Sequence, residues 1–159
     1  MEVTPNWDCT GATARQLSQK GVDDALLAGT NMRSRNIPVG QVLTSEYCRA
    51  LRTGERLNLG VTPETRPGLT YYVYADVLNR CVAHTAILNT APAAGTNTVV
   101  VAHSAIAGDS TFIPPVPAPD CSAQDALGRG NAIIYKPVPN GAPLEIVRGV
   151  TPAQWATLE

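Results

Sequence analysis

Histidine is scarce in this sequence, long apolar runs are missing, and neither sign of charge dominates. With two histidines and four cysteines that form no CxxC pair, the usual ligand spacing of a zinc site is absent. No apolar stretch approaches the roughly 20 residues that a membrane-spanning helix needs. The 12 Lys and Arg oppose 13 Asp and Glu, and the formal net charge of -1 gives no broad basic surface for nucleic acid. We therefore expect no metal, no membrane contact and no nucleic-acid partner, and any anion site must be local.

What is present fits one globular domain. A chain of 159 residues with 44% hydrophobic and 16% charged residues can close a hydrophobic core, so we expect a single domain over residues 1–159. The even number of cysteines permits two disulfides, as in a periplasmic or secreted protein, although four buried thiols in a cytosolic protein are as compatible with it. The first eight residues have neither the basic nor the apolar region of a signal peptide, so the compartment stays open.

Apolar spacing and breaker residues predict helices that alternate with buried strands. Helices are expected over residues 19–34, 47–57 and 71–89, with a short last helix after Thr151. Strands are expected over residues 41–45, 97–103, 131–136 and 144–148, the last two as an antiparallel hairpin. Residues 62–68 read as a loop, and residues 113–120, with four prolines, as irregular chain. This alternation favours a layered α/β fold.

Two of the predicted strands lead into residues that can bind an anion. Arg49 falls in the first turn of the helix after strand 41–45, and His103 ends strand 97–103. The carboxyl ends of strands in an open α/β sheet are where ligands bind, and helix N-termini there favour anions. An arginine fork beside an imidazole is a receptor for a phosphoryl group. The pattern alone leaves an alternative open, in which Arg49 is a surface arginine and His103 a strand-end histidine satisfied by its neighbours.

Several blocks of the chain, taken in order, resemble the histidine phosphatase superfamily, which is phosphoglycerate-mutase-like. The blocks are Leu17-Ser18-Gln19-Lys20-Gly21, residues 37–50 with Ser45-Glu46-Tyr47-Cys48-Arg49-Ala50, residues 95–103 ending in Val101-Ala102-His103, residues 131–137, and residues 151–155. Each block is weak alone, but together they cover nearly the whole chain. The resemblance implies a three-layer α/β/α fold, with a mostly parallel sheet and an antiparallel edge.

The resemblance also implies a phosphate pocket built from two histidines and two arginines. Arg49 and His103 match one of these pairs, as catalytic and phosphate-binding residues. In the superfamily the other pair is an "RHG" or "RHA" motif at the end of the first strand, and its histidine is phosphorylated during turnover. No Arg-His dipeptide occurs in this chain, and His84, which we expect on a helix surface, has a different setting. The sequence thus resembles an N-terminally incomplete domain that lacks the first central strand.

Two functions follow from the resemblance. One is phosphomonoester hydrolysis through a phosphohistidine, if the missing motif exists upstream. The alternative is a non-catalytic phosphate-binding module or a decayed pseudophosphatase. The expected partner is phosphate or a phosphorylated small molecule, with no cofactor, and open sheet edges favour self-association. Asp76, Asp109 and Glu64 are equal candidates for the proton donor, so none is assigned.

The resemblance also pairs two of the four cysteines. Cys9 lies in the loop that the superfamily places over the turn carrying Cys48. We therefore expect a disulfide between Cys9 and Cys48.

Overall fold

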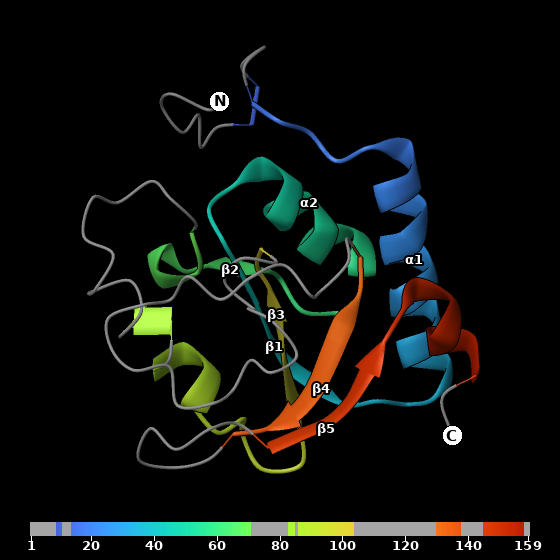
Figure 1. Cartoon of the computed structure of the whole chain (residues 1–159), viewed down its shortest axis with the longest axis vertical. Helices are drawn as coiled ribbons and strands as arrows, with labels where there is room; N and C mark the ends of the chain where they lie inside the picture. The colour runs from blue at the N-terminus through green and yellow to red at the C-terminus, as the bar shows by residue number, and fades with distance from the viewer. Residues whose placement is uncertain are drawn as a thin grey trace.

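The computed structural model describes residues 9–10, 14–70, 83–84, 86–103, 130–137 and 145–157 (Figure 1). The strands are β1 (Val39–Thr44), β2 (Glu64–Thr65), β3 (Asn97–Val101), β4 (Ala132–Lys136) and β5 (Glu145–Val150). The helices are α1 (Gln19–Ser34) and α2 (Cys48–Leu57), with 3-10 helices at Pro67–Leu69 and Pro152–Thr157. The fold is mixed α/β, with a parallel three-stranded sheet in the order β2-β1-β3 and an antiparallel pair of β4 and β5.

Helix α1 begins and ends where local chemistry requires it. The Ser18 hydroxyl oxygen accepts a hydrogen bond from the Gly21 N–H at 3.2 Å, which satisfies one of the N–H groups that an α-helix leaves unpaired at its start. At the other end Asn36 adopts a left-handed φ of 54°, and Pro38 follows. The buried face of α1 consists of Ala25, Ala28, Gly29 and Met32. The predicted helix over residues 19–34 is confirmed.

Helix α1 packs closely on the end of α2. A Cβ atom at Gly29 would overlap the Leu57 carbonyl, so the crossing requires a residue without a side chain. Arg33 Nη1 donates to the carbonyl oxygens of Leu57 and Asn58, both at 2.7 Å. These bonds satisfy carbonyls that a helix C-terminus leaves unpaired. Asn58 caps α2 in the left-handed conformation, with φ 48° and ψ 52°.

Strand β1 is the centre of the parallel sheet. It pairs with β3 from Val39↔Asn97 to Thr44↔Val101, and its last residues, Val42 to Thr44, are buried. On its other side Leu43 and Thr44 pair with the two residues of β2. Strand β2 corrects the sequence prediction of a loop over residues 62–68. A two-residue strand has no periodicity to detect, and its partner β1 decides its conformation.

The antiparallel pair and the C-terminal 3-10 helix complete the core. Val150 and Trp155 join Ala28, Met32 and Leu57 in one buried cluster, against which side chains of β1, β3 and β4 pack. The predicted hairpin of β4 and β5 is confirmed, while its turn lies outside the described residues. The last helix is 3-10 rather than α. Thr151 and Gln154 cap it reciprocally: the Thr151 N–H donates to Gln154 Oε1 at 2.8 Å, and the Gln154 N–H to Thr151 Oγ1 at 3.4 Å.

Both sheets pack against this core, but in the described residues no strand of one sheet is hydrogen-bonded to a strand of the other. Val99 and Val101 of β3 and Ala132 of β4 pack against the same buried cluster, yet within the described residues β3 and β4 are not paired strands.

Two other predicted segments lie largely outside the described residues. Of the helix predicted over residues 71–89, only residues 83–84 and 86–89 are described, and they are helical. Residues 113–120 are not described. No helix in the described part of the chain combines the length and the hydropathy of a membrane span.

Candidate functional site

The carboxyl ends of β1 and β3 bring Ser45 and His103 together. Because these strands are parallel neighbours, the residues that follow them leave the sheet at the same edge. The Ser45 N–H donates to the Val101 carbonyl at 3.0 Å, which continues the ladder one residue beyond β1. Ser45 Oγ and His103 Nε2 then lie 2.8 Å apart and form a hydrogen bond. His103 is therefore held by a fully buried serine at the point where β1 turns into α2.

Tyr47 joins His103 to Arg49. The Tyr47 ring meets the His103 ring edge to face, with centroids 5.0 Å apart and planes at 84°. The Arg49 guanidinium carbon lies 4.2 Å from the centroid of the Tyr47 ring, which is a cation–π contact. Tyr47 is buried, and Arg49 stands in the first turn of α2, at the positive end of its dipole. The two residues that the sequence singled out thus gather around one aromatic ring.

The surroundings of His103 keep its ring neutral. Burial, and after it the positive charges of Arg49 and Arg15, lower the pKa of His103 from 6.5 to about 3. Burial disfavours the imidazolium because a charge loses water, and two nearby cations add repulsion. The same field that disfavours a proton on His103 favours an anion beside it. The charge of Arg15, in the segment before α1, thus acts on His103 in the same direction as that of Arg49.

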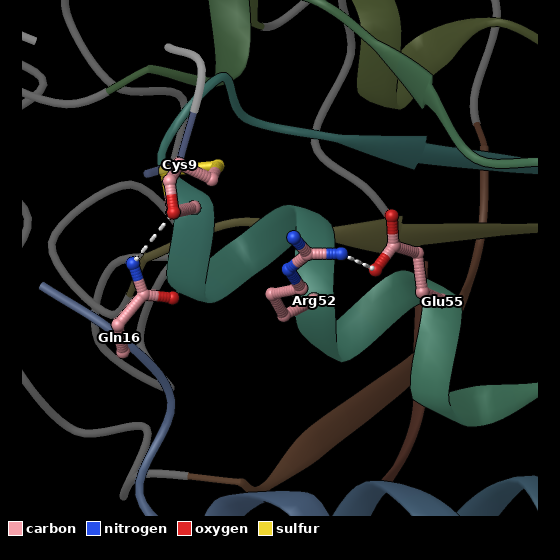
Figure 2. Close-up of a disulfide and its surroundings, with 5 residues drawn as sticks. Cys9, Gln16, Arg52 and Glu55 are labelled. Atoms are coloured by element: carbon pink, nitrogen blue, oxygen red, sulfur yellow. Dashed lines mark hydrogen bonds and ion pairs between the residues drawn. A yellow bond between two sulfur atoms is a disulfide. The ribbon is translucent and has the colours of Figure 1, made fainter. Parts of the chain in front are cut away.

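A disulfide fastens the segment that carries Arg15. Cys9 and Cys48 are bonded, with their Cα atoms 5.3 Å apart (Figure 2). The Gln16 side-chain amide donates to the Cys9 carbonyl oxygen at 3.2 Å, as the dashed line in Figure 2 shows. Cys48 is the first residue of α2 and stands between Tyr47 and Arg49. The pairing expected for these two cysteines is present in the structure, and Cys81 and Cys121 lie outside the described residues.

Thr70 holds the turn between β1 and α2 through two hydrogen bonds with Glu46. The Thr70 hydroxyl accepts from the Glu46 N–H at 3.0 Å and donates to Glu46 Oε2 at 3.1 Å. Thr70 is fully buried, so these bonds fix the turn that carries Ser45 and Tyr47. Glu64, a candidate proton donor, is instead engaged on β2, where its carboxylate pairs with Arg66 at 2.9 Å. The candidates Asp76 and Asp109 fall outside the described residues.

Sequence reasoning missed Arg15, Ser45 and Tyr47 as members of the site. Arg15 carried a weak signal, because it lies three residues before the N-cap of a helix and so near a helix N-terminus. His84 requires a correction: expected on a helix surface, it is half-buried, and burial lowers its pKa from 6.5 to about 4. Within the described residues no group of three or more His, Cys, Asp or Glu side chains could hold a metal ion.

Comparison with solved structures identifies the fold. A structure of the protein histidine phosphatase SixA, complexed with tungstate, superposes with a TM-score of 0.56 over 92% of this chain and 90% of that one, at 17% sequence identity. The chain has a phosphoglycerate-mutase-like fold. No family model matches the sequence, and no curated protein matches it either.

The phosphoglycerate-mutase-like fold explains the place of the site. The likeness covers nearly the full length of both chains. In such a layered fold the carboxyl edge of the parallel strands is the ligand edge. Ser45 and His103 follow two adjacent parallel strands, and Arg49 opens the helix between them in sequence. The cluster therefore lies at the carboxyl edge of the parallel strands.

Proposed function

We propose that this chain forms the phosphate-binding part of a histidine phosphatase-like phosphomonoester hydrolase, in which Arg49, His103 and Arg15 hold the phosphoryl group. The observation that carries the proposal is the cluster of His103, Tyr47 and Arg49 at the carboxyl edge of the sheet, where the charges of Arg49 and Arg15 disfavour a proton on the buried imidazole. The likeness to a protein histidine phosphatase that binds tungstate, an oxyanion of phosphate-like geometry, supports it.

Each of the three residues has a separate part in binding. The Arg49 guanidinium offers a planar fork of donors to the phosphoryl oxygens, and its stacking on Tyr47 orients that fork. Arg15 adds a second positive charge that acts on His103. The bound anion counters the repulsion that both arginines exert on the imidazole, so binding favours a proton on His103. His103 then stabilises charge on the phosphoryl oxygens as an imidazolium.

Catalysis needs one further group. Covalent phosphoryl transfer gains its rate from an in-line nucleophile, and the superfamily resemblance assigns that part to an Arg-His motif that this sequence does not contain. We propose that a strand from outside this sequence supplies it. Within the described residues β3 and β4 pack against one core and are not paired with each other, an arrangement compatible with a further strand between them. The absent motif also keeps a second function open: an anion-binding module without turnover.

The test compares turnover with binding. Hydrolysis of p-nitrophenyl phosphate and the affinity for tungstate are measured for the chain as given and for Arg49→Ala, His103→Ala and Arg52→Ala. The last is a matched control, because Arg52 lies on the same helix but pairs with Glu55 at 2.7 Å (Figure 2). We expect tungstate binding in the chain and in Arg52→Ala, roughly tenfold or greater loss in the other two, and no enzyme-like turnover in any.

Two results would change this proposal. Turnover that His103→Ala abolishes would make His103 the nucleophile. Tungstate affinity that neither Arg49→Ala nor His103→Ala lowers would remove the site altogether. Activity gained on adding an upstream segment with a strand that ends in Arg-His would establish the hydrolase over the binding module.

A further inference from the structure

A hydrogen bond from Ser45 holds the His103 ring at one of its nitrogen atoms. Ser45 Oγ lies 2.8 Å from His103 Nε2. The backbone of Ser45 is fixed separately, because its N–H donates to the Val101 carbonyl oxygen at 3.0 Å. Ser45 is fully buried, so bulk water does not reach its hydroxyl. The hydroxyl and the imidazole therefore meet at a point that the ends of β1 and β3 determine.

The turn after β1 gives this hydrogen bond a firm support. Ser45 engages Nε2, and the Tyr47 ring packs edge to face against the same imidazole. Glu46, which lies between them in sequence, is tied to Thr70 by two hydrogen bonds. Because the backbone of the turn is held in this way, the rotation of the Ser45 O–H bond is what can adapt to a change of charge on His103.

A serine hydroxyl suits both protonation states of an imidazole. It has one O–H donor and two acceptor lone pairs. In a neutral imidazole Nε2 is a donor or an acceptor according to the tautomer, and Ser45 Oγ can pair with it in either case. An imidazolium has an N–H at both nitrogens, and a buried N–H without an acceptor costs free energy. Ser45 Oγ is an acceptor within hydrogen-bond distance of that N–H.

We propose that Ser45 is a positioning residue of the anion site, whose hydroxyl accepts a hydrogen bond from Nε2–H when a bound anion converts His103 to its imidazolium form. This inference rests on the anion site proposed above. The charges of Arg49 and Arg15 disfavour a proton on His103 in the empty site, and a bound anion offsets them. The ring then takes up one proton from solvent, and Ser45 keeps its orientation unchanged while its charge changes.

The preceding residue, Thr44, offers a matched control. Thr44 is also fully buried, and within the described part of the chain its Oγ1 has no hydrogen-bond partner. Its Cγ2 lies against Gly54 of α2, and successive side chains of a strand point to opposite faces. Thr44→Val therefore removes a buried hydroxyl next to Ser45 in sequence, keeps the branched shape and leaves the partner of His103 in place.

The experiment combines tungstate titration by calorimetry with nitrogen NMR of the histidine rings near neutral pH. Wild type is compared with Ser45→Ala, with Ser45→Thr, which keeps a hydroxyl, and with Thr44→Val. The chain has two histidines, so the spectrum of His84→Gln assigns the signals of His103.

We expect Ser45→Ala to weaken tungstate binding about three- to tenfold, because the buried Nε2–H loses its acceptor. Saturating tungstate should raise the fraction of His103 that has both ring nitrogens protonated, and this rise should be smaller in Ser45→Ala. Ser45→Thr should restore the affinity and the protonated fraction, and Thr44→Val should match wild type in both.

Other outcomes overturn the inference in distinguishable ways. Equal affinity and equal protonation in wild type and Ser45→Ala would remove the part of Ser45 and leave the anion site standing. Weaker binding with an unchanged protonated fraction, an equal loss in Thr44→Val, or no recovery in a folded Ser45→Thr would make Ser45 a packing residue. Loss of the folded circular dichroism signal in Ser45→Ala would do the same.

The behaviour of the wild type separates this inference from the proposed function. Tungstate binding without a rise in the protonated fraction of His103 would reject the change of charge that Ser45 is proposed to accommodate. Absence of tungstate binding in the wild type would reject the anion site as well.

Discussion

At the scale of single residues, the surroundings of His103 disfavour its protonated form. A buried serine holds its ring, two arginines repel a positive charge, and the resulting pKa of about 3 leaves it neutral. Spacing predicted Arg49 and His103 because each follows a strand. It could not predict Arg15, which lies before the N-cap of α1 and whose charge contributes to the lowered pKa of His103.

This lowered pKa makes the stability of the fold depend on pH. The pKa values of His103 and His84 lie below 6.5 in the folded chain, so between pH 6.5 and about 4 the unfolded chain binds more protons. The free energy of unfolding should therefore fall as pH is lowered through this window. Urea unfolding from pH 7 to pH 4 measures it. His103→Gln and His84→Gln should each flatten the slope, and an unchanged slope in His103→Gln would contradict its neutral, buried state.

At the scale of elements, sequence patterns identified those with enough residues to show a period. Helix α1 was predicted to the residue, since Ser18, its apolar face and Asn36 all mark it. Strand β2 was missed because two residues have no pattern, and the 3-10 geometry at Pro152–Thr157 was missed because a short helix of either kind has similar spacing. In both segments, contacts with neighbouring elements decide the backbone conformation.

The crossing of α1 and α2 gives a prediction about Gly29. Gly29→Ala should lower the free energy of unfolding by about 1–3 kcal/mol or more, because the new methyl group meets the backbone of Leu57, which cannot move without shifting α2. Gly21→Ala is the matched control in the same helix. Its methyl group meets side-chain atoms of Leu17 and Ser18 and no backbone, so a shift of the Leu17 side chain and the helix preference of alanine should offset the contact. Equal urea midpoints for the two variants would contradict the close crossing.

At the scale of the whole molecule, the separation of the two sheets leads to a prediction about association. Within the described residues β3 and β4 belong to separate sheets and are not hydrogen-bonded to each other. A strand edge with unpaired backbone groups can add a strand from another chain. We expect the chain to associate with itself as concentration rises. Sedimentation velocity over a range of concentrations measures this, together with amide exchange, which should slow in β3 as the mass grows. A monomer at every concentration, with one cooperative melt, would show that no strand is lacking.

The attachment of α2 at both ends has a geometric consequence. The disulfide fixes its first residue, while Gly29 and Arg33 of α1 fix its last turn. Ten residues of α-helix form a rod about 15 Å long, so a tilt of about 4° at the Leu57 end displaces the Arg49 end by about 1 Å. A displacement of that size would weaken binding at the phosphoryl site proposed above. Side chains at the crossing with α1, at the other end of the helix, should therefore influence how the Arg49 guanidinium is aligned.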